Sequence, residues 1–508
     1  MRLDLENLPT DTALLHQLVR EMAGFVGERD GEIERLKAII KQLQRAQFGR
    51  RSERLDADQL ALALEDVETD LAAAEARRPD ILPAPARAQP KRKSLPDHLP
   101  REDRLIDIAS PVCACGGALH SIGESVSEML DWVPAQMRVI RIVRPKYACR
   151  ACATVVQAPA PERPIDGGLA TPALLAQVLV SKYCDHTPLY RQSKIFARHG
   201  VDLERSTLAG WVGGACWWLQ ALHDRLAENL FASGHLFADD TPIPVLDPGR
   251  GRTKTGRLWA YTRDDRPWGG PEPPGTVYVY APDRKGERPA AHLGRFKGVL
   301  QVDGYAGFEP LAASGDVKLA ACWAHTRRRF YEIAESTKAP VAVEALRRIG
   351  ELYAIEAQVR GQSAALRRAA RQESSRPLVD ALQTWLERQL TRVPPRGALA
   401  EAIRYALGRW DALSLFLTDG RIDLDNNPVE RAIRPIALGR KNHLFAGSDG
   451  GGDRWAVVGS LIETAKMNRV EPFAYLRDVL ERMVDGHPVN RLDELLPWAW
   501  KSGNHVNT

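Results

Sequence analysis

The chain has 508 residues, of which 44% are apolar, so it is long enough for three or more domains with real hydrophobic cores. Its formal net charge of +5 is too small to indicate a nucleic-acid partner by itself, so only the distribution of basic residues along the chain can indicate one. No apolar run reaches about 18 residues and no secretion signal is recognisable, which argues against a membrane span and predicts a cytoplasmic protein with reduced thiols.

Residues 1–77 are predicted to be polar helices that carry a heptad repeat. β-Branched residues occupy one seam position and leucine or methionine the other: Val19, Val26, Ile33 and Ile40, with Leu15, Met22, Leu36 and Leu43. This pattern favours a parallel two-stranded coiled coil, a leucine-zipper-like region that would make the protein a homodimer or a larger assembly. An amphipathic helix that packs on its own chain is the alternative.

Residues 78–105 are rich in proline and carry the basic run Lys91-Arg-Lys93, which predicts an extended linker. Its cations either contact a phosphate backbone or belong to a solvated tail.

Residues 106–160 contain two cysteine pairs, separated by a strand-like segment with several arginines. The pairs are Cys113 with Cys115, and Cys149 with Cys152. Two such pairs on tight turns predict a structural Cys₄ zinc site in a small ribbon with a basic face. The first pair is one residue shorter than the usual Cys-x-x-Cys, and a disulfide or unligated thiols are the alternatives. The remaining cysteines, Cys184, Cys216 and Cys322, lie in apolar sequence and are predicted to be core residues.

Residues 165–232 are predicted to be helical. One helix begins at Thr187-Pro188 and stops at Gly200, and Ser206-Thr207 are predicted to cap the next helix, which carries Trp211. Helix, glycine turn and capped helix resemble a helix-turn-helix, although the turn is longer than usual. Plain helical packing explains the same sequence.

Residues 233–465 change to a strand pattern. Apolar runs predict strands at 235–246, 258–262, 276–280, 298–303 and 317–323, with a helix at 287–294 and another from His325. Three strands, a helix and a fourth strand, with aspartates on the first and fourth, follow the order of a ribonuclease-H-like α/β core. A helical insertion is predicted near 338–418, a glycine-rich turn at 447–452, and helices at 455–468 and 471–485; residues 466–508 form a C-terminal helical region. The fold class is therefore multidomain α+β.

Three acidic residues are the candidate catalytic and metal-binding side chains. Asp239 and Asp303 close or follow predicted strands, and Glu430 lies at a helix start with Asn426 or Asn427 as N-cap. Such residues can converge at one sheet edge, where a carboxylate cluster needs counter-charge and Mg²⁺ or Mn²⁺ prefers oxygen ligands. Two metals roughly 3.5–4 Å apart would hold the attacking and leaving oxygens of a phosphodiester.

Several stretches together make the chain resemble transposases of the insertion-sequence 66 family, from about residue 13 to about residue 500. They are Phe48-Gly-Arg-Arg-Ser-Glu-Arg54, Pro145-Lys-Tyr-Ala-Cys149, Tyr190-Arg-Gln192, Val302-Asp-Gly-Tyr-Ala306, Cys322-Trp-Ala-His325 and Leu424-Asp-Asn-Asn-Pro-Val-Glu-Arg431. The resemblance implies a DDE transposase with Asp239, Asp303 and Glu430 as its triad. Family members often carry Glu directly after the first Asp, where this chain has Asp240.

Residues around the predicted cluster receive their own interpretations. Asp240 alternates to the other strand face and is expected to form a salt bridge or a cap. Cys322 and His325 could bind a metal, but a structural or substrate-positioning role is favoured. The predicted DNA-binding rim consists of Arg327, Arg328, Arg431, Arg434, Arg440 and Lys441; surface solvation is the alternative for any one of them.

The expected activity is binding of element ends, metal-dependent cleavage that frees a 3′-hydroxyl, and attack of that hydroxyl on target DNA. The expected partners are double-stranded DNA, further copies of the chain and accessory proteins encoded by the element, in a bacterial cytoplasm and associated with the nucleoid. A nuclease without strand transfer and a non-enzymatic DNA-binding regulator are the alternatives.

Overall fold

The computed structural model describes residues 140, 146–148, 155–157, 161–165, 168–247, 252–313, 315–443 and 446–501. The chain divides into two units, Met1–Ile140 and Arg141–Thr508, and the fold below is that of the second. The predicted coiled coil, the proline-rich linker and all four candidate zinc ligands lie outside the described residues.

A five-stranded mixed sheet is the centre of the second unit, with strand order β5-β4-β3-β6-β7. The strands are β3 His235–Asp247, β4 Arg252–Arg263, β5 Gly275–Ala281, β6 Gly298–Val302 and β7 Val317–Ala321. β3, β4 and β5 pair antiparallel, whereas β3 with β6 and β6 with β7 pair parallel. All five predicted strands are confirmed; β4 begins earlier than predicted because it pairs with β3 along nearly its whole length.

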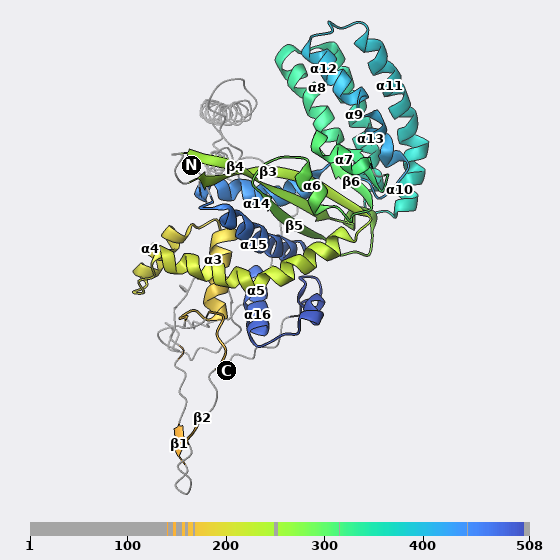
Figure 1. Ribbon diagram of the computed structural model, residues 1–508. Coiled ribbons are helices and arrows are strands. Elements are labelled where there is room, and N and C mark those ends of the chain that lie inside the picture. Colours follow the sequence, from red (N-terminus) through yellow and green to blue (C-terminus); the bar gives the residue numbers. More distant parts are fainter. Residues whose placement is uncertain are drawn as a thin grey trace, which may run out of the picture. The chain divides into compact units, whose positions relative to one another are not determined.

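Two helices protect the free edge of β5, α5 Arg205–Phe231 and α15 Asp449–Met467 (Figure 1). Ser460 Oγ accepts from the backbone N–H of Tyr278 at 2.8 Å, and Thr464 Oγ1 both accepts from and donates to the backbone of Thr276. His223 on α5 bonds the carbonyl of Tyr278 at 3.0 Å. These contacts satisfy edge groups that would otherwise offer a pairing template to another chain.

The glycine-rich segment before α15 differs from its prediction. It was expected to be a turn through residue 452, but α15 begins at Asp449, with the side chain of Ser448 accepting from the N–H of Gly451. The glycines allow close approach, because a side chain at Gly452 would collide with the ring of Tyr280.

The predicted helix-turn-helix-like region is helical and shares a hydrophobic core with the sheet. Its helices are α3 Pro172–Tyr183, α4 Leu189–Arg198 and the long α5. The predicted Ser206-Thr207 cap is wrong: α5 begins at Arg205, and its N-cap Glu204 makes no side-chain capping bond. Trp211 is buried in the shared core. Plain packing therefore accounts for at least the buried face of α5.

The stretch predicted as a helical insertion near 338–418 is helical, and together with α8, which precedes it, it encloses a hydrophobic core of its own, coloured green to blue in Figure 1. Its helices are α8 Trp323–Thr337, α9 Pro340–Val359, α10 Ala364–Ala370, α11 Arg376–Leu390, α12 Ala398–Leu407 and α13 Trp410–Ser414, with a π-helical turn at Arg371–Ser375 and a 3₁₀ turn at Leu415–Leu417. The remaining helices are α6 Glu287–His292, α7 Glu309–Ala312, α14 Asn427–His443 and α16 Pro472–Val484, with 3₁₀ turns at Arg266–Trp268, Ala306–Phe308 and Val489–Leu495.

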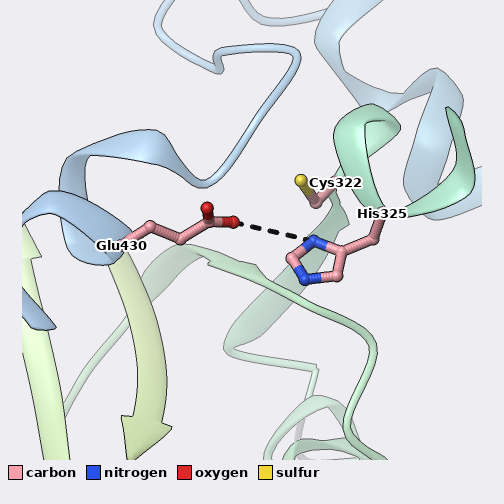
Figure 2. A group of neighbouring side chains, drawn as sticks. All are labelled: Cys322, His325 and Glu430. Atoms are coloured by element: carbon pink, nitrogen blue, oxygen red, sulfur yellow. Dashed lines mark ion pairs between the residues drawn. The ribbon is translucent and has the colours of Figure 1, made fainter. Parts of the chain in front are cut away.

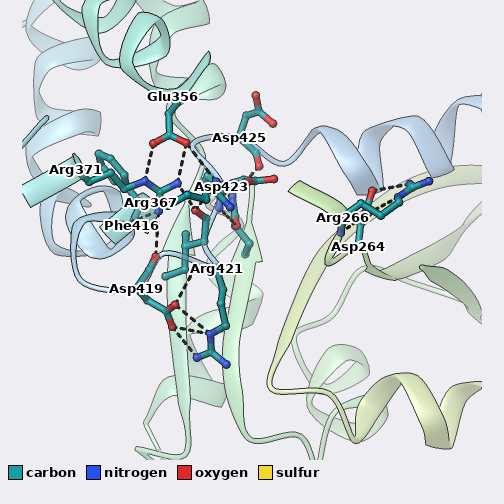
Figure 3. A network of polar contacts seen from close by, with 12 residues as sticks. Asp264, Arg266, Glu356, Arg367, Arg371, Phe416, Asp419, Arg421, Asp423 and Asp425 are labelled. Carbon is teal, nitrogen blue, oxygen red and sulfur yellow. Dashed lines mark hydrogen bonds and ion pairs between the residues drawn. The ribbon is translucent and has the colours of Figure 1, made fainter. Parts of the chain in front are cut away.

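Two buried arginines tie the insertion to the loop that leads into α14 (Figure 3). Arg371 makes a bidentate pair with Glu356, at 2.6 and 2.8 Å, and Arg367 reaches Asp423 at 2.6 Å. Arg371 also donates to the carbonyls of Phe416, Asp419 and Ile422. The insertion therefore fixes the backbone of residues 416–423, which lies just before the helix that carries Glu430.

Candidate active site

Strand register brings Asp239 and Asp303 to the same edge of the sheet. β3 and β6 are parallel neighbours in which Phe237 is paired with Gln301. This parallel pairing stops two residues before Asp239 and Asp303. Asp303 directly follows β6, as predicted, but Asp239 lies inside β3, where it is paired with Ala260 of β4, and not at a strand end as the sequence suggested. The carboxyl ends of parallel strands are the usual place for a site in an open α/β sheet.

Glu430 is brought to this edge by α14, and Asn426 fixes the start of that helix. Asn426 is fully buried, and its Nδ2 donates to the carbonyl of Ala238, the residue before Asp239, at 3.0 Å. The carbonyl of Asn426 accepts from the N–H of Glu430 at 3.2 Å. Asn426 directly precedes α14, at the N-cap position predicted for it, but its side chain joins α14 to β3 and makes no capping bond to the helix.

The three carboxylates influence one another electrostatically. Burial, with smaller contributions from the charges of Asp303, Asp240 and Glu430, raises the pKa of Asp239 to about 7, against one backbone hydrogen bond that lowers it. Oε1 of Glu430 is buried without a hydrogen-bond partner among the described residues. A partly buried group of acids with unsatisfied oxygens lacks positive charge at its centre.

The donor set of this group fits hard divalent cations. Asp239, Asp303 and Glu430 offer only carboxylate oxygens, which Mg²⁺ and Mn²⁺ prefer over the ligands that softer metals select. Burial and the neighbouring acids disfavour the ionised form of Asp239, and a cation held among these carboxylates would offset that effect.

Asp240 lies on the other side of the strand, as predicted. Its carboxylate is buried and accepts from Arg257 at 2.9 Å and from Arg284 at 2.9 Å. Burial raises its pKa, while the two guanidinium groups lower it. The predicted salt-bridge role of Asp240 is confirmed.

Cys322 and His325 come together with Glu430 at the start of α8 (Figure 2). His325 Nδ1 lies 3.8 Å from Glu430 Oε1, and Cys322 Sγ accepts from the backbone N–H of Asn426 at 3.3 Å. Burial raises the pKa of the Cys322 thiol to about 12, whereas backbone N–H groups of His325 and Asn426 lower it. Glu430 supplies the third possible ligand that sequence spacing did not reveal.

Tyr405 and Arg409 form a second group of residues that the sequence did not identify. Tyr405 donates its hydroxyl to the carbonyl of Asp303 at 3.0 Å, and Arg409 donates to the carbonyl of Gly304 at 3.2 Å. The guanidinium carbons of Arg329 and Arg409 lie 3.9 and 4.2 Å from the centre of the Tyr405 ring. The insertion thus holds the loop that carries Asp303 and concentrates positive charge beside it.

Gln301 was also missed. This fully buried residue of β6 donates to the carbonyls of Asp423 and Asp425 and accepts from the N–H of Asp423. It locks the loop before α14 to the strand that leads to Asp303. A glutamine inside a short apolar strand is the signal that could have found it, because a buried amide needs several partners.

The predicted DNA-binding residues divide into two groups. Arg327, Arg328, Arg431 and Arg434 are exposed, and Arg431 lies 3.9 Å from Asp264. Arg440 is partly buried and donates to the carbonyl of Pro242, and burial lowers the pKa of Lys441. With a rise of about 1.5 Å per residue, these last two lie roughly 15 Å from Glu430 along α14.

In the predicted zinc-binding region, the described residues form a two-stranded antiparallel ladder. Its strands are β1 Lys146–Ala148 and β2 Val155–Gln157. Of the cysteines predicted as core residues, Cys216 and Cys322 are buried and Cys184 is partly buried.

Comparison with known proteins identifies the family. The model described as "Transposase IS66 family" matches residues 167–454, more than half of the chain. This chain belongs to the IS66 transposase family. Further models match residues 460–498 ("IS66 C-terminal element"), 110–153 ("zinc-finger binding domain of transposase IS66") and 35–104 ("Transposase C of IS166 homeodomain").

Full-length relatives occur in Sinorhizobium fredii. "Uncharacterized protein y4jD" is 44% identical and "Uncharacterized protein y4qI" 42% identical, each alignment covering 99% of this chain and 99% of the relative. The family agrees with the resemblance found in the sequence. Among the helices that the structure describes, none is both long and apolar enough to cross a membrane.

Proposed function

We propose that this IS66-family chain is a DDE transposase with a ribonuclease-H-like core, which cleaves DNA at the ends of its element and joins those ends to target DNA. The proposal rests on the parallel β3–β6 pairing, which ends two residues before Asp239 and Asp303, and on the nearness of Asp303 and Glu430 to Asp239, whose pKa both charges raise. The sheet order, three antiparallel strands followed by two parallel ones, supports the core assignment.

Asp239, Asp303 and Glu430 are the residues proposed to hold Mg²⁺ or Mn²⁺. When bound, such cations supply charge neutralisation for an in-line phosphoryl transfer. The protein supplies position: Asn426 holds α14 against β3, and Tyr405 and Arg409 hold the loop of Asp303. No tyrosine or serine nucleophile is proposed.

Positive charge around the carboxylates is proposed to receive the DNA backbone. The exposed Arg327, Arg328, Arg431 and Arg434 are suited to phosphate contacts, which supply most of the affinity of such proteins for DNA. Arg440 and Lys441, which are farther along α14, are proposed to contact DNA outside the cleavage point.

The remaining assignments are proposals of the same kind. Cys113, Cys115, Cys149 and Cys152 hold a structural Zn²⁺, which the match to the family's zinc-finger model supports. Residues 1–77 dimerise the chain so that two element ends are held together, and element-encoded accessory proteins assist. The protein acts at the bacterial nucleoid.

The proposal is tested with Asp239→Ala, Asp303→Ala and Glu430→Ala on a DNA fragment that carries an element end. Each variant should lose cleavage and retain end binding, because DNA affinity comes mostly from cationic side chains. Asp316→Asn is the matched control, since this exposed aspartate precedes β7 at the opposite end of the sheet. Cleavage at the control's rate by any of the three alanine variants removes that residue from the site.

Two alternatives give different results in a second assay. A nuclease without strand transfer cuts element ends but leaves a pre-cut end unjoined to a target plasmid. A DNA-binding regulator binds the ends, and neither metal nor the three carboxylates affect what it does.

A further inference from the structure

A thiol, an imidazole and a carboxylate converge between the start of α8 and the first turn of α14. The possible ligand atoms of Cys322, His325 and Glu430 all lie within 4.8 Å of one another. They come from two segments more than 100 residues apart, and Figure 2 shows the Glu430 carboxylate directed toward the His325 ring.

The spacing is close to that of a metal site. Zinc is bound at about 2.0–2.3 Å by nitrogen, oxygen and sulfur, so tetrahedral geometry separates neighbouring ligand atoms by roughly 3.3–3.7 Å. His325 Nδ1 and Glu430 Oε1 are already 3.8 Å apart, so the three side chains need to contract by only about 1 Å.

The three groups are also set up to act as ligands. Cys322 Sγ accepts from the backbone N–H of Asn426 at 3.3 Å, an interaction that orients the sulfur toward the other two groups. The N–H of Trp323 donates to the carbonyl of Leu424 at 2.8 Å and fixes the backbone beside the cysteine. His325 Nδ1 and Glu430 Oε1 are both buried without a hydrogen-bond partner among the described residues, so two unsatisfied atoms face each other beside an oriented sulfur.

We propose that Cys322, His325 and Glu430 form a binding site for a borderline-soft divalent cation, Zn²⁺ above all. Sulfur and imidazole ligands select such ions over Mg²⁺, so this site differs in chemistry from the all-oxygen cluster. Glu430 belongs to both sites. A consequence, which rests on the proposed function, is that Zn²⁺ draws Glu430 away from Asp239 and Asp303 and inhibits DNA cleavage.

Binding is tested by titrating the full-length protein with Co²⁺, after dialysis has lowered its zinc to about one equivalent per chain, the amount proposed for the four-cysteine site. A thiolate-to-cobalt absorption band should saturate at about one added equivalent, because one cysteine and one histidine define a single site. The band should be absent in Cys322→Ser, and Co²⁺ should bind at least about tenfold more weakly to His325→Gln. Cys216→Ser is the matched control, since Cys216 is a buried free cysteine on α5, and it should titrate as the wild type does.

Absence of the band from the wild type, or its persistence in Cys322→Ser, overturns the proposal; persistence assigns the band to other cysteines. If Cys322→Ser does not fold, the Co²⁺ affinity of His325→Gln alone tests the site. The His325 side chain is about a quarter exposed, so its replacement should be tolerated. An unchanged Co²⁺ affinity in His325→Gln then overturns the site.

Inhibition is measured separately, as cleavage in Mg²⁺ with added Zn²⁺, relative to each protein's own rate without Zn²⁺. Half-inhibition should need at least about tenfold more Zn²⁺ in His325→Gln than in Cys216→Ser. Equal sensitivity of these two variants rejects the inhibitory consequence. If Glu430→Ala cleaves DNA at the wild-type rate, the proposed function is wrong. The binding site is judged separately, by the Co²⁺ titration.

Discussion

The buried pair between Arg371 and Glu356 offers a sharp test of how the insertion supports the site. The side chain of Arg371 is fully buried and donates two bonds to Glu356 and three to backbone carbonyls of residues 416–422. Replacing it by Met keeps most of the volume but leaves the Glu356 carboxylate without its main partner. Breaking a buried ion pair by removing one member costs about 3–5 kcal/mol.

We therefore expect Arg371→Met to lower the free energy of unfolding by about 3–5 kcal/mol, a large fraction of the roughly 5–15 kcal/mol typical of a folded domain. The double variant Arg371→Met/Glu356→Leu should recover part of this loss, because it leaves no uncompensated charge. Arg347→Met is the control: Arg347 also pairs in bidentate fashion with a glutamate, Glu344, but on the surface, where water screens the pair and its loss should change stability little.

The measurement is chemical denaturation of the three variants and the wild type, followed by tryptophan fluorescence, with DNA cleavage measured on the folded fraction. Trp410 and Trp323 are buried in the insertion core and report its unfolding. The cleavage rate should fall with Arg371→Met and not with Arg347→Met, because the loop that leads to Glu430 loses its anchor. A destabilisation below about 1 kcal/mol in Arg371→Met would refute the reasoning, since the pair would then behave as a surface contact.

Three further outcomes are expected. Burial raises the pKa of Asp265 from 3.8 to about 6, so its contribution to stability is present at low pH and is lost as the pH rises between these values. In thermal unfolding, the stability of Asp265→Asn relative to the wild type should therefore increase by about 1 kcal/mol between pH 4 and pH 7, after discounting for screening by water. If the difference between the two proteins does not change with pH, this reasoning is wrong. Elemental analysis should find at least one zinc per chain, lowered by Cys149→Ser, and less than a tenth of an equivalent in protein purified without chelator would reject the zinc ribbon. A double variant with charged residues at Ile33 and Leu36 should be monomeric in light scattering and should form fewer paired-end complexes. Burial of each apolar seam side chain contributes about 1.5–3 kcal/mol, which a charged residue would remove. A double variant that stays dimeric locates the interface elsewhere.

Local patterns in the sequence were sufficient for the sheet. Short apolar runs predicted all five strands, and the positions of Asp239 and Asp303 relative to them follow from the strand register. The buried role of Asp240 followed from alternation along β3. The strands and the buried position of Asp240 could be predicted because they depend on neighbouring residues and on the two-residue alternation of side chains along a strand.

Long-range contacts could not be predicted in the same way. Tyr405 meets Asp303 across about 100 positions, and Asn426 meets Ala238 across nearly 190, so no periodicity joins them. Arg367 and Arg371 look like solvated residues of a polar helix, but they are buried because Glu356, Asp423 and several carbonyls converge on them. Gly450, Gly451 and Gly452 suggested a turn, whereas they lie in the first turn of α15, where Gly452 packs against the ring of Tyr280.

The most direct test of the central claim is the joining of a pre-cut element end to a supercoiled plasmid, in Mg²⁺, by Asp303→Asn and Asp316→Asn. This substitution removes one carboxylate charge while changing little in size, and in the control it does so at the far end of the sheet. The account predicts that Asp316→Asn joins the end at the wild-type rate, whereas Asp303→Asn binds the end normally and yields no joined product. Joining by Asp303→Asn at the rate of its control would contradict the assignment of the carboxylate cluster as the catalytic centre.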